Sequence, residues 1–287
     1  MPTTLGPVAT PEAQRVFERP VRARGPEGPW AELRAGIEEH GSALAYAHLE
    51  DWLPDDLEDP GLRGLLGPDY ARFSAMTHPQ VRSRFVASRL MLKYAACAVI
   101  GAEPHGVELA YKPGGRPYLR GMDQLDISLS HTDSLLLVGL TRRGWIGVDA
   151  ELKDRPMLGR STERQVCTPY ECEALELIAD EHRNGALVRL WTLKEAYSKA
   201  IGQGMRFRFT EFGFQPEEQG SARVLRPDGS PGHGAEWTFH TCLLERRYTV
   251  SVALFERGFG ERHSAESELP DEQGLLAALG ARQERRT

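Results

Sequence analysis

The sequence predicts an α+β protein built from two similar halves. A long amphipathic helix over residues 79–101 is followed by short strand-like runs, and a second helix ending near residue 201 is again followed by such runs. No clean internal sequence repeat accompanies this alternation. We expect halves at 11–145 and 146–256, followed by a polar tail at 257–287.

The first half is expected to contain a helix within residues 30–49, a loop over 61–68 and the long helix. Pro79 suits the first turn of that helix and Gly101 suits its C-terminal cap. Its predicted apolar face consists of Val81, Phe85, Leu92, Ala96 and Val99. The residues expected to lie away from this face are Arg82, Arg89 and Lys93.

Strands are predicted in both halves. The runs LDISLS, LLLVGLT and WIGVDAE have hairpin-length connectors, which favours an antiparallel meander. Thr168 to Glu171 is a capping box that opens a helix reaching about Arg183, and a second helix runs from about Ala186 to the cap at Gly202. The remaining expected elements are strands at 206–214, 236–244 and 248–255, a long loop or hairpin at 216–236, and a loosely attached helix near 275–279.

Composition excludes several classes of protein. The 35 basic and 41 acidic residues give a net charge of −6, which argues against general nucleic-acid binding. No segment reaches the roughly 20 apolar residues that cross a bilayer, and the first residues have no apolar secretory core, so we expect a cytoplasmic protein without a membrane partner. The four cysteines lack CxxC spacing and are expected to be reduced thiols.

Two carboxylates mark the first candidate site. In Gly147-Val-Asp149-Ala-Glu151, residues two apart on a strand share a face, so Asp149 and Glu151 would lie side by side. A hard cation such as Mg²⁺ relieves the repulsion between adjacent carboxylates. The pattern is very common, and read alone the pair is better explained as a solvated strand end.

The second candidate is a helix that carries two of the five lysines in the chain. Glu195 and Lys199 are four residues apart and share a helix face, which fits a surface ion pair or part of a site. Lys194 lies inside the apolar stripe of the helix. It must therefore extend out to solvent or reach an anion.

Two further patterns lie in the first half. Ser128-Leu-Ser130-His131 ends a predicted strand, and Gly115-Arg116-Pro117 lies in a turn. Taken singly, the histidine reads as a structural residue and the turn as an ordinary one, although arginine offers a bidentate fork to phosphate.

In their order and spacing, these four motifs resemble those of the Sfp-type 4′-phosphopantetheinyl transferases. That family carries G-K-P, S-H-S, G-[IV]-D-x-E and W-[ST]-x-K-E-[AS]-x-x-K in the same order, and the resemblance covers roughly Tyr70 to Phe255. It implies two pseudo-symmetric α/β halves with the coenzyme A site in the cleft between them. It also implies Mg²⁺-dependent transfer of the phosphopantetheine arm to a serine of an apo acyl or peptidyl carrier protein, with release of adenosine 3′,5′-bisphosphate.

The resemblance also implies roles for individual residues. Asp149, Glu151 and Glu195 would bind the metal, and Glu195, or a water held by the metal, would be the base. Catalysis would use Glu195, Lys199 and Asp149. The residues implied to bind coenzyme A, through its pyrophosphate or its 3′-phosphate, are Arg72, Arg84, Arg116, Ser130, His131, Lys194 and Lys199.

This chain departs from the family at two of these places. Arg116 stands where lysine is usual, and Asp69 stands where relatives often have a basic residue, so Arg82 or Arg89 is a candidate replacement in the 3′-phosphate site. The segment from Met157 to Leu177 is expected to dock the carrier through apolar residues and local arginines such as Arg160 and Arg164.

The resemblance further implies a monomer and tolerance of Mn²⁺ in place of Mg²⁺. Two alternatives share the same residues. One is a Mg²⁺-dependent hydrolase of nucleotide diphosphates, and the other is a carrier- or coenzyme-binding module without catalysis.

Overall fold

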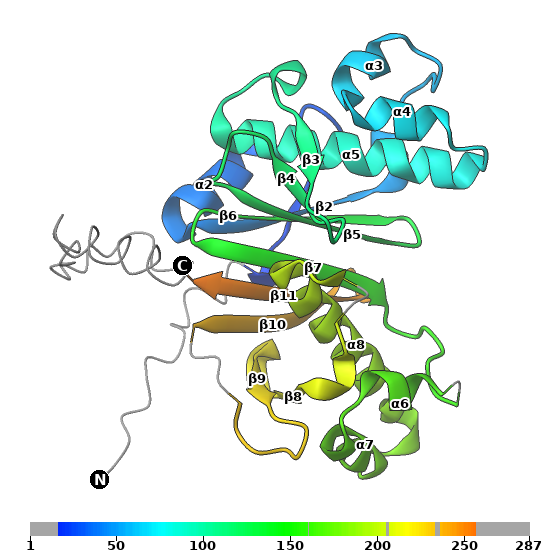
Figure 1. Ribbon diagram of the computed structural model, residues 1–287, viewed down its shortest axis with the longest axis vertical. Coiled ribbons are helices and arrows are strands. Elements are labelled where there is room, and N and C mark those ends of the chain that lie inside the picture. Colours follow the sequence, from blue (N-terminus) through cyan, green and yellow to red (C-terminus); the bar gives the residue numbers. More distant parts are fainter. Residues whose placement is uncertain (1–16, 160, 205–206, 233–235, 257–287) are drawn as a thin grey trace, which may run out of the picture. The chain divides into compact units, whose positions relative to one another are not determined.

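Two β-sheets packed face to face, each covered on its outer side by a 22-residue helix, form the core of the protein (Figure 1). The computed structural model describes residues 17–159, 161–204, 207–232 and 236–256, all of which belong to one unit. The α+β class with two α/β halves is confirmed. The predicted tail and its helix near 275–279 lie outside the described residues.

The first half contains a four-stranded sheet in the order β1-β2-β6-β5, which is antiparallel except for the β1–β2 pair. Its strands are β1 (Val21–Arg22), β2 (Ser42–His48), β5 (Asp126–Thr132) and β6 (Leu135–Thr141), and a small hairpin joins β3 (Leu109–Tyr111) to β4 (Pro117–Leu119). Its helices are α2 (Trp30–His40), α3 (Gly61–Leu66), α4 (Asp69–Ser74) and α5 (Pro79–Ile100).

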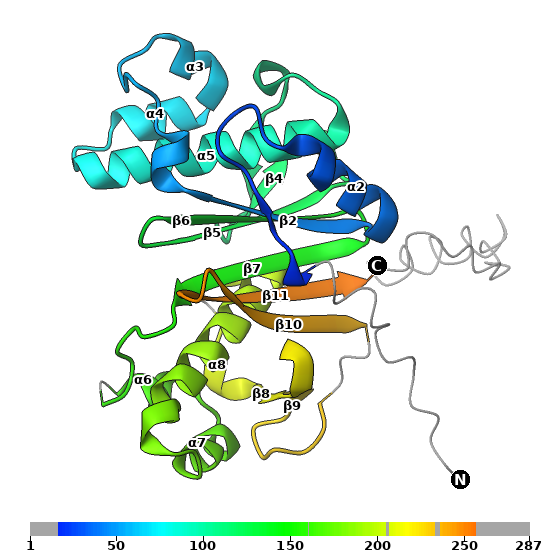
Figure 2. The same cartoon turned by 180° about the vertical axis from the view of Figure 1, so that it is seen from behind.

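The second half contains a three-stranded antiparallel sheet in the order β10-β11-β7. Its strands are β7 (Gly144–Leu152), β10 (Trp237–Leu244) and β11 (Tyr248–Glu256), and β8 (Gly213–Pro216) pairs separately with β9 (Ala222–Leu225). Its helices are α6 (Thr162–Val166), α7 (Pro169–Glu176) and α8 (Asp180–Ile201). Figure 2 shows the same layers from behind.

Strand β6 explains how the two sheets pack, because it is buried along its whole length. Leu136 and Val138 belong to the core beneath α5, whereas Leu135 and Leu137 pack between the sheets against Val148 of β7. A strand that is buried on both faces reads as a continuous apolar run, as LLLVGLT does. The core between the sheets therefore holds the two halves together.

The predicted meander is correct for its first two strands, since β5 and β6 form an antiparallel hairpin, but it is wrong for the third, because β7 does not pair with β6. It pairs through its backbone with β11 in the second sheet. Along its other edge, three side chains of β5 act as rungs: Asp126 accepts from Ile146 N at 2.7 Å, Ser128 from Val148 N at 3.0 Å, and Ser130 from Ala150 N at 3.3 Å. Side-chain oxygens thus satisfy backbone donors that a neighbouring strand would otherwise bind.

The helix predicted within residues 30–49 is only half correct. Helix α2 ends where Gly41 takes a left-handed conformation, with φ of 71°. The following segment, SALAYAH, is buried in the sheet as β2, so tertiary packing overrides the helix preference of its alanines. The loop predicted over 61–68 contains α3, whose Leu62 and Leu66 are buried one helical turn apart.

Two other predictions need correction. Lys93 is buried in α5 and Val81 is exposed, opposite to the predicted face, whereas the ends of this helix are as expected. The strand predicted over 206–214 is replaced by a 3₁₀ turn at Phe209–Glu211 and by β8, because the alternating phenylalanines gather around Tyr197. Part of the predicted loop at 216–236 is β9.

The predicted capping box and the predicted free thiols are confirmed. The capping box is present, with Glu171 N donating to Thr168 Oγ1 at 3.2 Å, although α7 ends at Glu176 and α8 already begins at Asp180. All four cysteines are free thiols. Within the described ranges, no helix has the length and apolar character needed to cross a membrane. The domain boundaries stay a prediction.

Gly147 sets the distance between β7 and α8. A Cβ atom at this position would lie 1.9 Å from Ala196 O and 2.5 Å from Ala200 N, which are backbone atoms of the helix. Only a residue without a side chain allows so close an approach.

We therefore expect Gly147→Ala to lower the free energy of unfolding by roughly 1–3 kcal/mol through overpacking. Gly185→Ala is the control, since its Cβ would meet no atom within 4 Å and the residue is exposed on α8. That control is expected to keep or slightly raise stability. Denaturant titration measures both variants, and an equal midpoint for Gly147→Ala and wild type would contradict the packing argument.

Candidate active site

The face of β7 that looks toward α8 carries the acidic motif. Side chains alternate along a strand, so Gly147, Asp149 and Glu151 share this face, while Val148 points into the core between the sheets. The close approach at Gly147 brings α8 and its Lys199 to this face. The i, i+2 spacing and the missing side chain together place the two motifs side by side.

A cavity of about 290 Å³ opens between β5, β7 and α8. It is lined by Arg89, Tyr111, Gly115, Pro117, Leu129, Ser130, His131, Asp149 and Lys199. Six of these belong to the four sequence motifs: Gly115, Pro117, Ser130, His131, Asp149 and Lys199. The structure therefore gathers residues from all four motifs around one space.

Asp149 is the centre of the polar network. It is 6% exposed, and its Oδ1 accepts from Ser130 Oγ at 2.8 Å and from Lys199 Nζ at 2.6 Å. Lys199 Nζ also donates to Val148 O at 3.1 Å. These bonds fix Lys199 over the cavity and link β5, β7 and α8.

Glu195 lies one helical turn before Lys199 on α8. Burial raises the pKa of its carboxyl group, and the negative charge of Asp149 raises it further, while Lys199 and Arg155 act in the opposite direction. A carboxylate with a raised pKa is a stronger proton acceptor once it is ionised. The environment of Glu195 thus suits a general base.

Glu151 is more firmly held than the sequence indicated. Its Oε1 accepts from Thr132 Oγ1 at 2.7 Å and from Leu152 N at 2.9 Å, and its Oε2 pairs with Arg155. Both carboxylate oxygens therefore already have partners within the protein.

His131 lies at the wall of the cavity among positive charges. Partial removal from water lowers the pKa of its imidazole, as do Arg84, Lys199 and Arg89, to about 4. The buried Nε atoms of Arg84 and Arg89 have no hydrogen-bond partner within the described residues. This concentration of positive potential suits an anion.

The pKa of His131 predicts a dependence of stability on pH. In the unfolded chain, the histidine has a pKa of about 6.5 and binds a proton below that pH, whereas in the folded chain it binds one only below about pH 4. The free energy of unfolding should therefore fall as the pH drops from about 6.5 to about 4. We expect His131→Gln to reduce that fall. Thermal melts of both proteins between pH 4.5 and 7.5 measure the difference, and parallel curves would contradict the assignment.

Arg89, and not Arg82, reaches the cavity. Asp69, which is 5% exposed, holds Arg89 with a 3.4 Å ion pair and also accepts from the Tyr111 hydroxyl group. The acidic residue that departs from the family pattern thus orients a basic one. Arg82 pairs with Glu58 at 2.7 Å, and the exposed Arg72 lies over the Phe85 ring at 5.3 Å. Neither of these two arginines lines the cavity.

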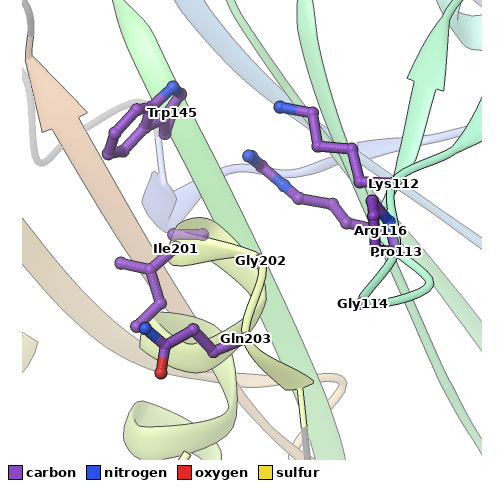
Figure 3. A pocket seen from close by; sticks show the side chains of 9 residues that line it. Lys112, Pro113, Gly114, Arg116, Trp145, Ile201, Gly202 and Gln203 are labelled. Atoms are coloured by element: carbon purple, nitrogen blue, oxygen red, sulfur yellow. The ribbon is translucent and has the colours of Figure 1, made fainter. Parts of the chain in front are cut away.

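Arg116 faces a different space. Its guanidinium group pairs with Asp126 and donates to Ile146 O at 3.1 Å, so it buttresses the rung between β5 and β7. Figure 3 shows it with Lys112 opposite Trp145, lining a separate cavity of about 460 Å³. Of the Gly115-Arg116-Pro117 motif, only Gly115 and Pro117 line the cavity at His131, and the expected role of Arg116 as a coenzyme A ligand stays a prediction.

Lys194 also has partners within the protein. Its side chain is fully buried, and its Nζ binds Glu171 Oε2 at 2.5 Å and the carbonyl oxygens of Val166, Phe209 and Phe212. A lysine in an apolar stripe does reach an anion, but the anion belongs to the protein. These contacts argue against a contact between Lys194 and coenzyme A, and the expected role of Lys194 as a coenzyme ligand stays a prediction.

Comparison with known proteins agrees with these motifs. Residues 146–253, which span β7 to β11, match the family model described as the 4′-phosphopantetheinyl transferase superfamily. The matched stretch contains Asp149, Glu151, Glu195 and Lys199. Over these residues, the chain is therefore similar to this superfamily.

Individual relatives of the superfamily differ in how much they share. A phosphopantetheinyl transferase of Thraustochytrium sp. is 28% identical over 76% of this chain and 77% of its own length. The 4′-phosphopantetheinyl transferase HetI of Nostoc sp. is 32% identical over 49% of this chain, a match that spans 61% of the relative. A solved holo-(acyl-carrier-protein) synthase of Bacillus anthracis aligns with 40% of this chain and 96% of its own, at 18% identity and a TM-score of 0.32, which is too distant to bear on the fold.

The superfamily resemblance implies a magnesium ion, and the positions of Asp149, Glu151 and Glu195 indicate which of these acids could bind it. The charge of Asp149 raises the pKa of Glu195, so these two carboxylates are close enough to repel and a cation would relieve that repulsion. Within the described ranges, no group of three or more His, Cys, Asp or Glu side chains forms a complete metal site. Mg²⁺ commonly takes one or two protein carboxylates together with water and phosphate oxygens. Asp149 and Glu195 fit that role, whereas Glu151 would first have to release Arg155.

Sequence reasoning missed several members of this superfamily site. Thr132 and Arg155 hold Glu151, and Tyr111 with Asp69 holds Arg89. Arg155 lies four residues after Glu151, which is a visible pairing signal. Tyr111 gives no such signal, because 42 residues separate it from Asp69.

Proposed function

We propose that this chain transfers the 4′-phosphopantetheine arm of coenzyme A to a serine of an apo acyl or peptidyl carrier protein. The other product would be adenosine 3′,5′-bisphosphate. The observation that carries the proposal is the cavity in which Ser130, His131, Asp149 and Lys199 meet, within a chain that is similar to the 4′-phosphopantetheinyl transferase superfamily over residues 146–253.

The positive side of the cavity fits the phosphates of coenzyme A. Arg84, Arg89 and His131 would hold the 3′-phosphate, because their charges converge, the buried Nε atom of Arg84 lacks a hydrogen-bond partner among the described residues, and Asp69 orients Arg89 through its Nε atom. Lys199 would lie at the pyrophosphate, where its ammonium group offers donors beyond those used by Asp149. Ser130 contributes by orienting Asp149.

The transfer step then uses Glu195 and Lys199. Glu195 accepts the proton of the carrier serine while the serine oxygen bonds to the β-phosphorus of coenzyme A. The bond from that phosphorus to the bridging oxygen breaks, and Lys199 stabilises the charge that develops on the leaving bisphosphate. Asp149 keeps Lys199 in place during this step.

Asp149 and Glu195 would hold Mg²⁺, or Mn²⁺ in its place, with Glu151 as a third acid if it leaves Arg155. When bound, the metal neutralises negative charge on the pyrophosphate.

The carrier is proposed to dock on the segment 157–177. Leu177 is 89% exposed at the end of α7, and Arg164 is exposed on α6, while Arg160 lies outside the described residues. An apolar contact beside positive charge suits an acidic carrier helix.

Reversing the charge of this segment is expected to weaken carrier docking. Arg160→Glu with Arg164→Glu should raise the KM for carrier about tenfold and leave the KM for coenzyme A unchanged, because rim charges act mainly on association. Steady-state kinetics with a pure apo carrier measure both constants. An unchanged KM for carrier would show that docking lies elsewhere.

Intact-mass measurement of an apo carrier after incubation with this protein, coenzyme A and Mg²⁺ tests the proposed function. The expected result is a metal-dependent gain of one phosphopantetheine group, absent for Asp149→Ala. Breakdown of coenzyme A without carrier modification would favour a hydrolase, and stable carrier binding without any chemistry would favour a binding module. The expectation of a cytoplasmic monomer stays a prediction from the sequence.

A further inference from the structure

The two long helices carry a lysine at the same place. Helices α5 and α8 are both 22 residues long, and both Lys93 and Lys194 lie 14 residues after the first residue of their helix. Both side chains are buried, at 4% and 0% exposure. Buried lysines are rare, so two in corresponding positions need a common reason.

The two lysines also bind equivalent partners. Lys93 Nζ donates to Leu65 O at 2.5 Å, and Lys194 Nζ donates to Val166 O at 2.6 Å. In each case the acceptor precedes the lysine by 28 residues. Each acceptor lies at the end of a short helix, α3 or α6, whose last carbonyl groups lack partners within the helix. The lysine of each long helix thus anchors the short helix that precedes it.

A weak sequence repeat supports this equivalence. It appears when the two helices are aligned on Lys93 and Lys194. KYAACAVIG begins at Lys93, and KEAYSKAIG begins at Lys194. The two segments share lysine, alanine, isoleucine and glycine in register, and both helices end at a left-handed glycine, with φ of 71° and 74°. The first half has Tyr94 and Ala98 where the second has Glu195 and Lys199, so it keeps the buried lysine without the acid or the second lysine.

Lys194 has gained additional partners in the second half. It pairs with Glu171, which itself accepts from Thr168 N at 2.8 Å and from Phe214 N at 2.7 Å. Lys194 also binds Phe209 O at 2.8 Å and Phe212 O at 3.0 Å. The ammonium group of Lys194 therefore connects α8 to the α6–α7 segment and to the chain just before β8. Lys194 immediately precedes Glu195 in α8.

We infer that Lys194 is a positioning residue, which locks the turn of α8 that carries Glu195 to the α6–α7 segment and does not contact coenzyme A. This inference rests on the proposed function for its kinetic part only. It extends that function by coupling the proposed carrier-docking segment mechanically to the proposed base.

Three variants test the inference. Lys194→Met leaves the buried Glu171 carboxylate without its cation, so it should lower Tm, speed hydrogen exchange in α6 and α7, and reduce kcat by about tenfold to a hundredfold through misplacement of Glu195. The KM for coenzyme A should stay within about twofold. Lys194→Met with Glu171→Gln removes the unpaired charge and should recover much of the Tm, whereas kcat should stay low because the contacts that lock the Glu195 turn are still missing.

Glu171→Gln alone covers the case in which Lys194→Met does not fold. It removes the charge but keeps an acceptor, and the inference expects a lower kcat with an unchanged KM for coenzyme A. Lys93→Met is the matched control in the other half. It should lower Tm and speed exchange in α3, with kcat within about threefold of wild type.

The outcomes separate the two roles. A well-folded Lys194→Met with a KM for coenzyme A raised tenfold or more, or a double variant that regains the wild-type kcat without Lys194, would overturn the inference. So would a folded Glu171→Gln with wild-type kcat. If the wild type transfers nothing, the proposed function fails, and Tm and hydrogen exchange still decide whether Lys194 anchors α6 and α7.

Discussion

Replacing Glu195 with glutamine is expected to lower kcat for transfer by roughly 10²- to 10⁴-fold, the range typical of a lost general base. Glutamine keeps the size of the side chain but cannot take the proton of the carrier serine. Because burial and Asp149 raise the pKa of Glu195, wild-type kcat/KM should rise with pH through a value above the ordinary carboxyl range. The variant should lose this rising limb.

Rates of carrier modification from pH 5 to 8, followed by intact mass, provide the measurement. Glu181→Gln is the matched control, because Glu181 lies in the exposed first turn of the same helix. It should retain both the rate and the pH profile. A Glu195→Gln variant with the wild-type pH profile would assign the base to another group.

The second large effect is expected for Lys199→Met. Loss of this ammonium group removes a donor to the leaving bisphosphate, and removal of one such donor typically costs about 10²- to 10³-fold in kcat. It also leaves Asp149, which is 6% exposed, with Ser130 as its remaining side-chain donor among the described residues. The free energy of unfolding should fall by about 1–3 kcal/mol as a result.

Single-turnover kinetics with saturating coenzyme A separate the loss in rate from any loss in binding. Lys153→Met is the control, since Lys153 is exposed just beyond β7. It should match wild type in rate and stability. A Lys199→Met variant that keeps its single-turnover rate would remove Lys199 from the transfer step.

Local patterns predicted the parts of the site that depend on short-range geometry. The i, i+2 spacing of Asp149 and Glu151, the helical spacing of Glu195 and Lys199 and the cap at Gly202 are properties of single elements, and all of these elements are present. The motif order then indicated that the elements meet. Their meeting at Lys199 and Asp149 required the packing at Gly147, which no periodicity reveals.

The sequence did not indicate the long-range partners of several residues. Lys194 looked available for a phosphate because its helix alone offers no anion, whereas Glu171 reaches it from 23 residues earlier in the chain. Arg116 looked free because Asp126 belongs to a different predicted strand. The path of β7 into the second sheet was hidden for the same reason, since β11 follows it by about a hundred residues.

The rungs from Asp126, Ser128 and Ser130 to β7 have a consequence for engineering. Hydrogen bonds between two backbones cannot be removed by exchanging side chains. Each hydrogen bond from β7 to a β5 side chain, in contrast, can be removed by one substitution. Ser130 also binds Asp149, so it cannot be altered without disturbing the acid. Among the described contacts, the Ser128 side chain accepts only from Val148 N. It is therefore the position at which the contact between the two sheets can be varied separately from Asp149. Ser128 is not among the residues that line the cavity, so its substitution would change the contact between β5 and β7 without removing a cavity-lining side chain.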